Sequence, residues 1–240
     1  AASTSKINEQ VALLGNGDRY VGASSTATLP ATPAVLAGDI AAAGANPAEA
    51  ALCYPGTLDP AAAAGTVVVC DRGVTARTNK SLAVQEAGGV GMVLVNTSAN
   101  SINADFHAVP TVHLQNTDRA AVKAYAATAG ATAAINAASL VFNAPAPFTA
   151  SFSSRGPLRA GNGDLLKPDL IAPGQDILAA VAPPGNSGRS FDLYSGTSMS
   201  SPHVAGLAAL LKAKHPDWSP MAIKSALMTT AGDVLDGPNT

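Results

Sequence analysis

Two short apolar runs with a helical stretch between them constrain the fold of this chain most. Residues 66–70 and 90–95 are rich in valine, and each has the length of a buried strand. The stretch between them, 79–87, has a helical pattern that stops at Gly88 and Gly89, a typical C-terminal signal. A strand, a helix and a second strand in this order predict an α/β arrangement.

The elements expected after these runs extend the same arrangement. A third strand is expected over 109–114, and a helix over 117–128 in which Thr117 can cap the first turn. A further strand, at 133–135 or at 140–142, would complete the set. Together these segments predict a small α/β unit.

The N-terminal segment has the pattern of a hairpin. Residues 11–14 and 20–21 flank Asn16 and Gly17, a dipeptide that accepts the positive φ of a tight turn. The stretch 23–60 that follows is rich in proline, alanine and glycine and has weak periodicity. Loops, short strands and turns are expected there.

The character of the chain changes after the proline-rich residues 143–147, where we expect a domain boundary. A strand is expected at 148–152. Two helices are expected near the C-terminus, over 198–214 and 220–230, because apolar residues recur at helical spacing in the first. Ser219 would cap the second helix, which starts with a proline.

The composition excludes some classes of partner. Charged residues make up 12% of the chain and the net charge is −2, so no basic surface for nucleic acid is expected. The uncharged stretch 125–154 is too rich in Ala, Thr, Asn and Ser to span a membrane. Residues 1–10 contain no apolar core of a secretory signal.

The two cysteines, Cys53 and Cys70, allow two interpretations from the residues alone. They are two buried thiols of a cytosolic protein, or a disulfide of a secreted one. Neither belongs to a CxxC pair and no nearby histidine completes a zinc set, so no metal site is expected. No cofactor is expected either.

A run of small residues, 195–206, leads into the first C-terminal helix and places Ser198 at its N-terminus. Free backbone N–H groups and the helix dipole favour negative charge at this position. An acyl-transfer enzyme needs such a position for its nucleophile, because an oxyanion develops beside the attacking oxygen. The plainer interpretation of a serine before a helix is that it only caps the helix.

The complete string, Gly-Thr-Ser-Met-Ser-Ser-Pro-His-Val-Ala-Gly, resembles the nucleophile signature of the subtilase family of serine proteases. The resemblance implies that Ser198 is the nucleophile and that its backbone N–H is an oxyanion donor. It also implies that Thr197 supports the oxyanion hole and that Met199 is the oxidation-sensitive neighbour. With similar blocks before and after the string, the resemblance covers about 148–234. It implies the C-terminal half of a subtilisin-like α/β catalytic domain.

The middle of the chain resembles the protease-associated domain that is inserted in some subtilases. The segments that carry this resemblance are Cys53 with 55–60, then 67–73 and 87–92. It implies a small α/β or α+β domain that serves protein interaction or substrate access, a Cys53–Cys70 disulfide and a secreted protein.

The two resemblances divide the chain into three parts. Residues 1–22 are expected to be a hairpin of the subtilase core. Residues 23–144 are expected to form the protease-associated domain, and 145–240 the C-terminal part of the catalytic domain.

Other parts of the family's catalytic machinery are not found in this sequence. No aspartate begins the acid motif Asp-(Ser/Thr)-Gly, and no histidine begins the base motif His-Gly-Thr. His203 lies one turn along the same helix as Ser198, which directs its ring away, and in the family it is structural. Asn162 is expected in an ordinary turn and His113 inside a strand. The chain is therefore expected to begin after the family's acid, base and oxyanion asparagine.

These observations predict a fragment of a secreted subtilisin-like serine endopeptidase that hydrolyses peptide bonds through an acyl-enzyme on Ser198. The fragment is expected to be inactive without its partner, the N-terminal half of the catalytic domain; its substrate would be a protein or peptide. Two alternatives remain: a protein-interaction module built on the protease-associated domain, and a pseudo-protease.

Overall fold

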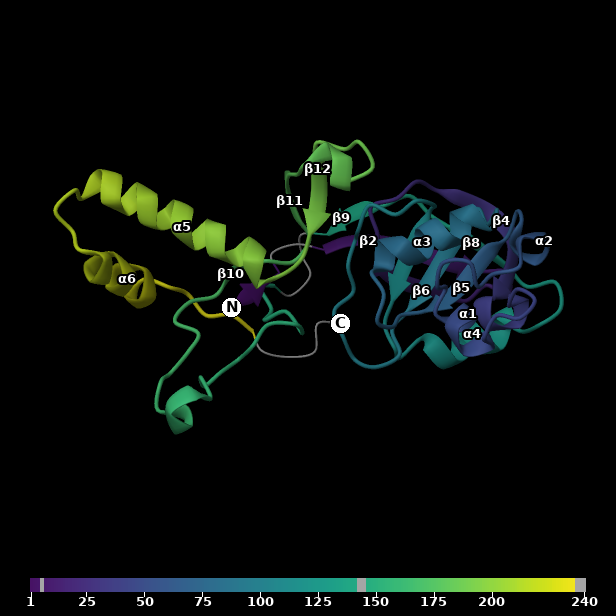
Figure 1. The fold of residues 1–240 in the computed structure, drawn as a ribbon, viewed down its shortest axis with the longest axis horizontal. Helices are drawn as coiled ribbons and strands as arrows, with labels where there is room; N and C mark the ends of the chain where they lie inside the picture. The colour runs from purple at the N-terminus through teal and green to yellow at the C-terminus, as the bar shows by residue number, and fades with distance from the viewer. Residues whose placement is uncertain (5–6, 142–145, 236–240) are drawn as a thin grey trace. The chain divides into compact units, whose positions relative to one another are not determined.

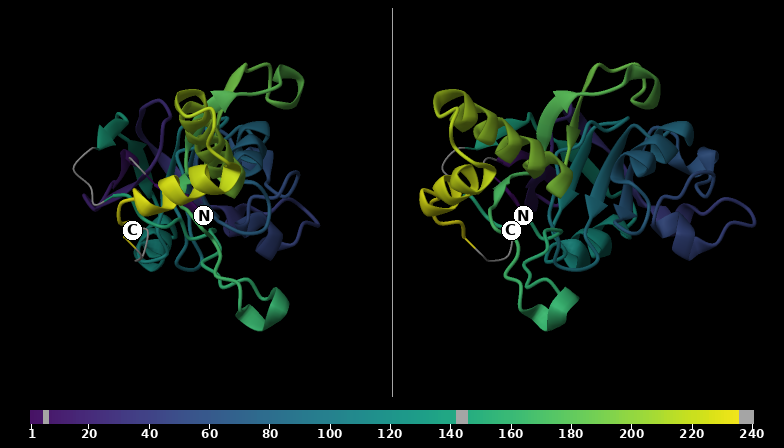
Figure 2. Two further views of the ribbon diagram at one scale, coloured as in Figure 1. Left: turned by 90° about the vertical axis from the view of Figure 1, so that its left-hand side faces the viewer. Right: turned by 60° about the vertical axis from the view of Figure 1, so that its left-hand side comes forward.

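A computed structural model describes residues 1–4, 7–141 and 146–235. The chain forms two compact units, which are described separately below (Figure 1, Figure 2). One unit is a continuous segment, Ile7–Phe142. The other combines Ala1–Lys6 with Asn143–Asn239.

The first unit opens with the expected hairpin. Strand β2 (Ile7–Leu14) pairs antiparallel with β3 (Arg19–Ala23). Gly17 adopts a φ of 94° in the turn, and the Asp18 N–H donates to Asn16 Oδ1 at 3.1 Å. The prediction of a tight Asn-Gly turn is confirmed.

Eight strands of this unit form one sheet in the order β3-β7-β6-β5-β4-β8-β2-β9. The strands after the hairpin are β4 (Leu29–Leu36), β5 (Val67–Asp71), β6 (Gly91–Val95), β7 (Thr111–Leu114), β8 (Thr132–Ile135) and β9 (Ser139–Val141). Strands β4 to β7 run parallel to one another. The additional β2–β3 pairing closes seven of the strands into a ring, and β9 pairs with β2 outside it.

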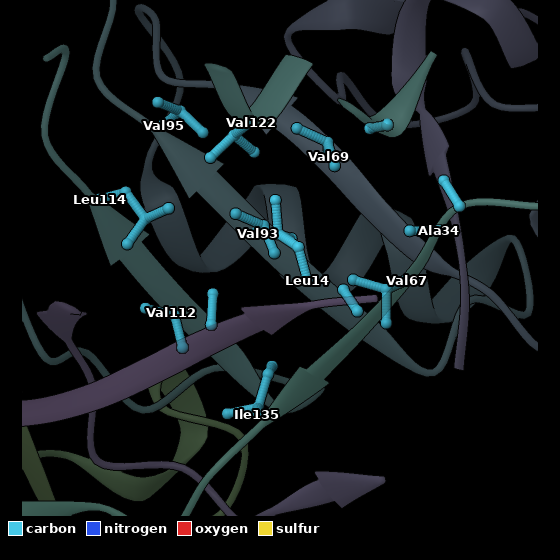
Figure 3. Packing of buried hydrophobic residues seen from close by; sticks show 14 residues of the cluster. Leu14, Ala34, Val67, Val69, Val93, Val95, Val112, Leu114, Val122 and Ile135 are labelled. Carbon is cyan, nitrogen blue, oxygen red and sulfur yellow. The ribbon is translucent and has the colours of Figure 1, made fainter. Parts of the chain in front are cut away.

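Side chains of the central strands alternate between two hydrophobic cores. Val67 and Val69 of β5, with Val93 and Val95 of β6, belong to the first core, which Figure 3 shows. Their neighbours in sequence face the second core, whose members include Val68, Cys70, Met92 and Leu94. Burial on both faces explains why these strands are continuous apolar runs rather than alternating ones.

Helices cover both cores. Helix α3 (Arg77–Glu86) contributes Val84 to the second core, and α4 (Arg119–Ala126) contributes Val122 to the first. Both helices were expected. Thr117 does not cap α4, however: Asp118 occupies the cap position, and the Thr117 hydroxyl donates to its carboxylate instead, at 3.3 Å.

Part of the stretch expected to be loops and turns contains two short helices, α1 (Pro47–Ala51) and α2 (Pro60–Ala63). Asn46 and Asp59 cap them, each accepting a backbone N–H at 2.9 Å. Asparagine or aspartate followed by proline starts a helix as readily as a turn, so these signals are ambiguous in sequence. A 3-10 turn (Ala37–Ile40) precedes α1.

The expected place of the hairpin was wrong. Residues 1–22 were assigned to the subtilase core, but β2 pairs with β8 and β9, and β3 pairs with β7. The unit therefore begins at Ile7 rather than at residue 23. Alternating apolar residues indicate a strand but not the sheet that it joins.

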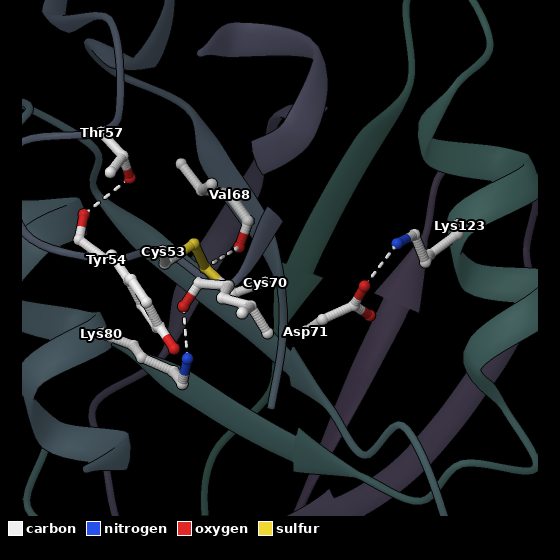
Figure 4. The surroundings of a disulfide bond; sticks show 9 residues. Cys53, Tyr54, Thr57, Val68, Cys70, Asp71, Lys80 and Lys123 are labelled. Atoms are coloured by element: carbon white, nitrogen blue, oxygen red, sulfur yellow. Dashed lines mark hydrogen bonds and ion pairs between the residues drawn. A yellow bond between two sulfur atoms is a disulfide. The ribbon is translucent and has the colours of Figure 1, made fainter. Parts of the chain in front are cut away.

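Cys53 and Cys70 form the expected disulfide (Figure 4), with Cα atoms 5.7 Å apart. Both cysteines are fully buried in the second core. Beside them Lys80 is also inaccessible to solvent, donates to the Leu52 carbonyl and lies 5.3 Å from the centre of the Tyr54 ring. Burial lowers the pKa of Lys80 to about 8. The disulfide holds the turn after α1 to β5, and Lys80 holds the same turn to α3.

A buried carboxylate fixes α4 to the end of β5. Asp71 accepts two hydrogen bonds from Arg119, at 2.8 and 2.7 Å, and one from Lys123 at 2.7 Å. Burial alone raises the pKa of Asp71, but the hydrogen bonds from the two cations outweigh it and lower that pKa below its ordinary value. The ionised form is therefore favoured by folding.

Replacing Asp71 by asparagine should lower the free energy of unfolding at neutral pH by about 2 kcal/mol. Because the folded pKa lies below the unfolded one, this contribution is present above about pH 4 and is lost as the pH falls further. Urea unfolding of both proteins at pH 7 and at pH 3 tests this. A stability difference that is equal at the two pH values would contradict the assignment.

In the second unit, β1 (Ala2–Ser3) pairs parallel with β10 (Ala172–Pro173). Strands β11 (Ile177–Ala180) and β12 (Phe191–Tyr194) form an antiparallel pair. Two 3-10 turns lie at Ala160–Gly163 and Pro183–Gly185. All of these elements precede residues 195–206 in the chain.

The prediction of a strand at 148–152 was wrong. Phe148 and Thr149 form only isolated bridges, with Leu235 and Ser3. The apolar pattern was too short to specify a continuous ladder.

Two helices end this unit, α5 (Thr197–Lys214) and α6 (Pro220–Thr229), as expected. Ser219 caps α6 by accepting the Ala222 N–H at 3.2 Å. The cap and the proline at the first position explain why α6 starts at this point.

Candidate active site

Ser198 lies in the first turn of α5, one residue after the helix begins, and its side chain is exposed. The backbone N–H groups of a first helical turn have no partner within the helix and point outward. This turn contains no acidic residue, whereas Lys212 and Lys214 lie in the last turn. The positive end of the dipole is therefore available to an anion beside Ser198.

The loop that leads to Ser198 is held by a reciprocal pair of hydrogen bonds. The Asp176 N–H donates to Ser195 Oγ at 2.8 Å, and that hydroxyl donates to Asp176 Oδ1 at 3.0 Å. Asp176 has a φ of 53°, a left-handed conformation that aspartate and asparagine tolerate better than most residues. The pair fixes the backbone just before the helix.

Glycine at position 174 allows a second close contact with this loop. The Gly196 N–H donates to the Gly174 carbonyl at 2.7 Å, and the Gly174 N–H donates to Ser3 O at 2.9 Å. A Cβ atom on Gly174 would lie 2.2 Å from Ser200 Oγ and 2.8 Å from Gly196 O. Only glycine permits this approach. Neither Gly174 nor Asp176 was singled out from sequence.

His203 does not act as a base toward Ser198 in this geometry. Its Nδ1 lies 2.8 Å from the Met199 carbonyl, an acceptor, so this nitrogen carries the proton. His215, at the end of α5, stacks on Trp218 with ring centres 4.1 Å apart. The expectation that His203 is structural agrees with its contact to the Met199 carbonyl.

The other two histidines lie inside the unit 7–142. His113 is fully buried, accepts the Asn103 N–H at 3.0 Å and contacts Asn96 Oδ1 at 2.8 Å through Nε2. Burial lowers the pKa of His113 well below its ordinary value and that of His107 to about 4. Across the residues that the structure describes, no carboxylate or imidazole is hydrogen-bonded to Ser198.

Two further residues named in the sequence analysis are Thr197 and Asn162. Thr197 is the exposed first residue of α5. Asn162 is in the 3-10 turn with a φ of 58°, as expected of an ordinary turn.

A cavity of about 420 Å³ lies beside the first turns of α5. Its lining includes Thr197, Ser200, Lys167, Asp169 and Lys224. Asp169 forms ion pairs with both lysines, which lower the pKa of its carboxyl group. The acidic group in this cavity is therefore ionised and already paired.

Two other properties concern the described part of the chain only. In 1–4, 7–141 and 146–235, no three His, Cys, Asp or Glu side chains come together as metal ligands. Among the helices in those residues, none is long and apolar enough to cross a membrane.

Comparison with known proteins assigns the family. Residues 23–240 match the model of the subtilase family of peptidases, and this match extends over most of the chain. The chain belongs to the subtilase family, whose members are serine peptidases.

Two plant proteins illustrate the similarity. The chain is 45% identical over 237 residues to subtilisin-like protease SBT1.7 of Arabidopsis thaliana, covering 92% of this chain and 31% of the relative. It is 48% identical over 198 residues to SBT1.3 of the same plant, covering 78% and 25%. The chain thus spans about a third or less of the length of these relatives.

A solved structure, the subtilisin-like protease Apa1 from the Antarctic psychrotroph Pseudoalteromonas sp. AS-11, aligns with 97% of this chain and 45% of its own. Its identity is 15% and the TM-score is 0.34, too low to bear on the fold. The α/β class follows from the strands and helices described above.

Proposed function

We propose that this chain is the nucleophile-bearing part of a secreted serine endopeptidase and that Ser198 forms the acyl-enzyme. The observation that carries the proposal is Ser198 at the open end of α5, in a loop fixed by Asp176 and Gly174. Its hydroxyl oxygen would attack the substrate carbonyl carbon, and its own N–H would bind the oxyanion. Thr197 would support that oxyanion hole.

The chain needs further polypeptide to complete the reaction. A serine hydroxyl attacks only when a base accepts its proton, and the base needs an orienting carboxylate. Ser198 has neither neighbour in the described ranges, and the sequence contains neither family motif. We propose that the acid, the base and the oxyanion asparagine come from the N-terminal half of the catalytic domain.

The surface of α5 supports this proposal. The middle of the helix, 204–211, contains only apolar residues and glycine, yet Leu207 is 51% exposed and Leu210 is 70% exposed. A helix that is apolar all round belongs in the interior of a domain. An apolar groove of about 440 Å³, lined by Val204 and Leu227 among others, also lies between α5 and α6. The absent half of the catalytic domain would cover these surfaces.

The unit 7–142 has a different role in this proposal. It has two cores and a disulfide of its own. The Ser81 hydroxyl lies 3.0 Å from His107 Nδ1, but Ser81 is fully buried and its hydroxyl donates to the Thr78 carbonyl. We assign it as the protease-associated domain that controls substrate access or binds protein partners.

Expressed alone, the unit 7–142 should fold and unfold cooperatively. A segment that stays unfolded in isolation would contradict its independence.

Trapping the covalent intermediate tests the central part of the proposal. The full-length protease is mixed with an ester substrate, quenched in acid within the first turnover and digested with trypsin. We expect the acyl group on the peptide 190–212, at Ser198. Acylation of any other residue would overturn the assignment of the nucleophile.

Asp176 should act as a positioning residue for Ser198. Replacing Asp176 by alanine removes the carboxylate that accepts from Ser195, so kcat of the full protease should fall by about 100-fold. Asparagine keeps an acceptor oxygen and tolerates the same φ, so Asp176→Asn should recover most of the activity. Equal kcat values for the alanine variant and the parent would contradict this role.

A further inference from the structure

Two acceptor motifs for N-linked glycosylation occur in the sequence, Asn79-Lys80-Ser81 and Asn96-Thr97-Ser98. Both lie in the unit 7–142. The motif alone does not distinguish them, because each has the required asparagine and hydroxyl residue. Their structural environments are opposite.

Asn79 can carry a large polar group. It lies in the first turn of α3, its side chain is exposed, and it has no side-chain hydrogen bond to any described residue. The neighbours that follow it, Lys80 and Ser81, are buried and hold the helix in place. A group attached to the Asn79 amide nitrogen would extend into solvent without displacing any contact.

Asn96 cannot carry a sugar in the folded protein. Its side chain is fully buried, and Nδ2 lies 3.1 Å from Gln115 Oε1 and 3.1 Å from the Asn100 carbonyl. On its other side, Oδ1 lies 2.8 Å from His113 Nε2. A sugar on this nitrogen would break the network and would have no space, so a chain modified there could not reach this fold.

We propose that Asn79 is the N-glycosylation site of this unit and that Asn96 stays unmodified; the inference rests on the proposed secretion. The donor is a polyprenyl-pyrophosphate-linked oligosaccharide. The Asn79 amide nitrogen forms a bond to C1 of the terminal N-acetylhexosamine while the bond from C1 to the pyrophosphate oxygen breaks. The amide nitrogen loses one proton, and the lipid pyrophosphate leaves.

The modification must precede folding. In the folded unit the Ser81 hydroxyl donates to the Thr78 carbonyl at 2.8 Å and accepts the Ala108 N–H at 3.1 Å. After folding, the motif is part of helix α3 and the Ser81 hydroxyl already makes these two hydrogen bonds. It is then not free to take part in recognition by the transferring enzyme.

The glycan would also shield an apolar residue. Leu82 follows Asn79 by three residues on α3, lies on the same face and is 44% exposed. A sugar at Asn79 would cover this leucine and improve the solubility of the outer face of the helix.

The test uses the full-length protein, directed by a strong signal sequence into the secretory pathway of a eukaryotic host. Peptide N-glycosidase in ¹⁸O-water converts each glycosylated asparagine into labelled aspartate, which mass spectrometry locates. We expect labelling at Asn79 and none at Asn96. On a gel, the Asn79→Gln variant should migrate faster than the parent by the mass of one glycan. The control Ser98→Ala destroys the second motif at an exposed residue and should migrate like the parent.

An unlabelled Asn79 in the secreted protein would overturn the proposal, and so would labelling at Asn96. A parallel expression with the protein's native leader separates this inference from the proposed function. If the glycan appears with the strong signal but not with the native leader, the acceptor assignment is supported and secretion is contradicted.

Discussion

Replacing Ser198 with alanine is expected to lower kcat of the full-length protease by about 10⁶-fold, the scale of losing a triad nucleophile. The loss should be this large because the remaining groups have no atom that can form the acyl bond. KM should change little, since the serine hydroxyl contributes little to substrate binding. Hydrolysis of a fluorogenic peptide under saturating conditions measures both parameters.

Ser190→Ala is the matched control. Ser190 is an exposed serine of the same unit whose side chain has no hydrogen-bond partner in the described part of the chain. Its activity should equal that of the parent. If Ser198→Ala instead kept more than about a thousandth of the parent kcat, another residue would have to be the nucleophile.

Removing the disulfide should have the largest effect on stability. The bond between Cys53 and Cys70 closes a loop with a sequence separation of 17 residues. Loop-closure entropy predicts that its loss lowers the free energy of unfolding by about 3 kcal/mol. Cys53→Ala with Cys70→Ala, compared with the parent in urea unfolding under oxidising conditions, measures this difference.

The same comparison under reducing conditions is the control. A reductant should bring the parent close to the double variant, because both then lack the cross-link. A variant that unfolds at the same urea concentration as the oxidised parent would contradict the stabilising role of the bond.

The secondary structure that sequence predicted well is the part with strong local signals. The apolar runs 66–70 and 90–95 became β5 and β6, and the Asn16-Gly17 turn formed as expected. Helices α5 and α6 follow from apolar spacing and from the Ser219 cap. Each of these signals acts over a few residues, so it does not depend on the rest of the fold.

Features that depend on distant residues were not predictable in the same way. The hairpin pattern did not specify that β2 pairs with β8 and β9. The helices that begin at Pro47 and Pro60 have signals that they share with turns.

The candidate site also has one part that is recognisable from local sequence and another that depends on distant residues. The string 195–206, on which the proposed nucleophile Ser198 rests, is continuous in sequence and could be recognised there. The Asp176–Ser195 pair joins residues 19 positions apart, and nothing in either segment indicates the contact. The close approach at Gly174 likewise depends on Ser200 and Ser3, which lie in other segments. Only the folded unit brings these groups together.

The central claim is that Ser198 is positioned as a nucleophile but is activated by polypeptide outside this chain. The most direct measurement is labelling of the isolated chain with a fluorophosphonate probe, followed by mass spectrometry, beside the full-length protease. We predict stoichiometric labelling of Ser198 in the full-length protein and none in the isolated, folded chain. Stoichiometric labelling of Ser198 in the isolated chain would contradict the claim.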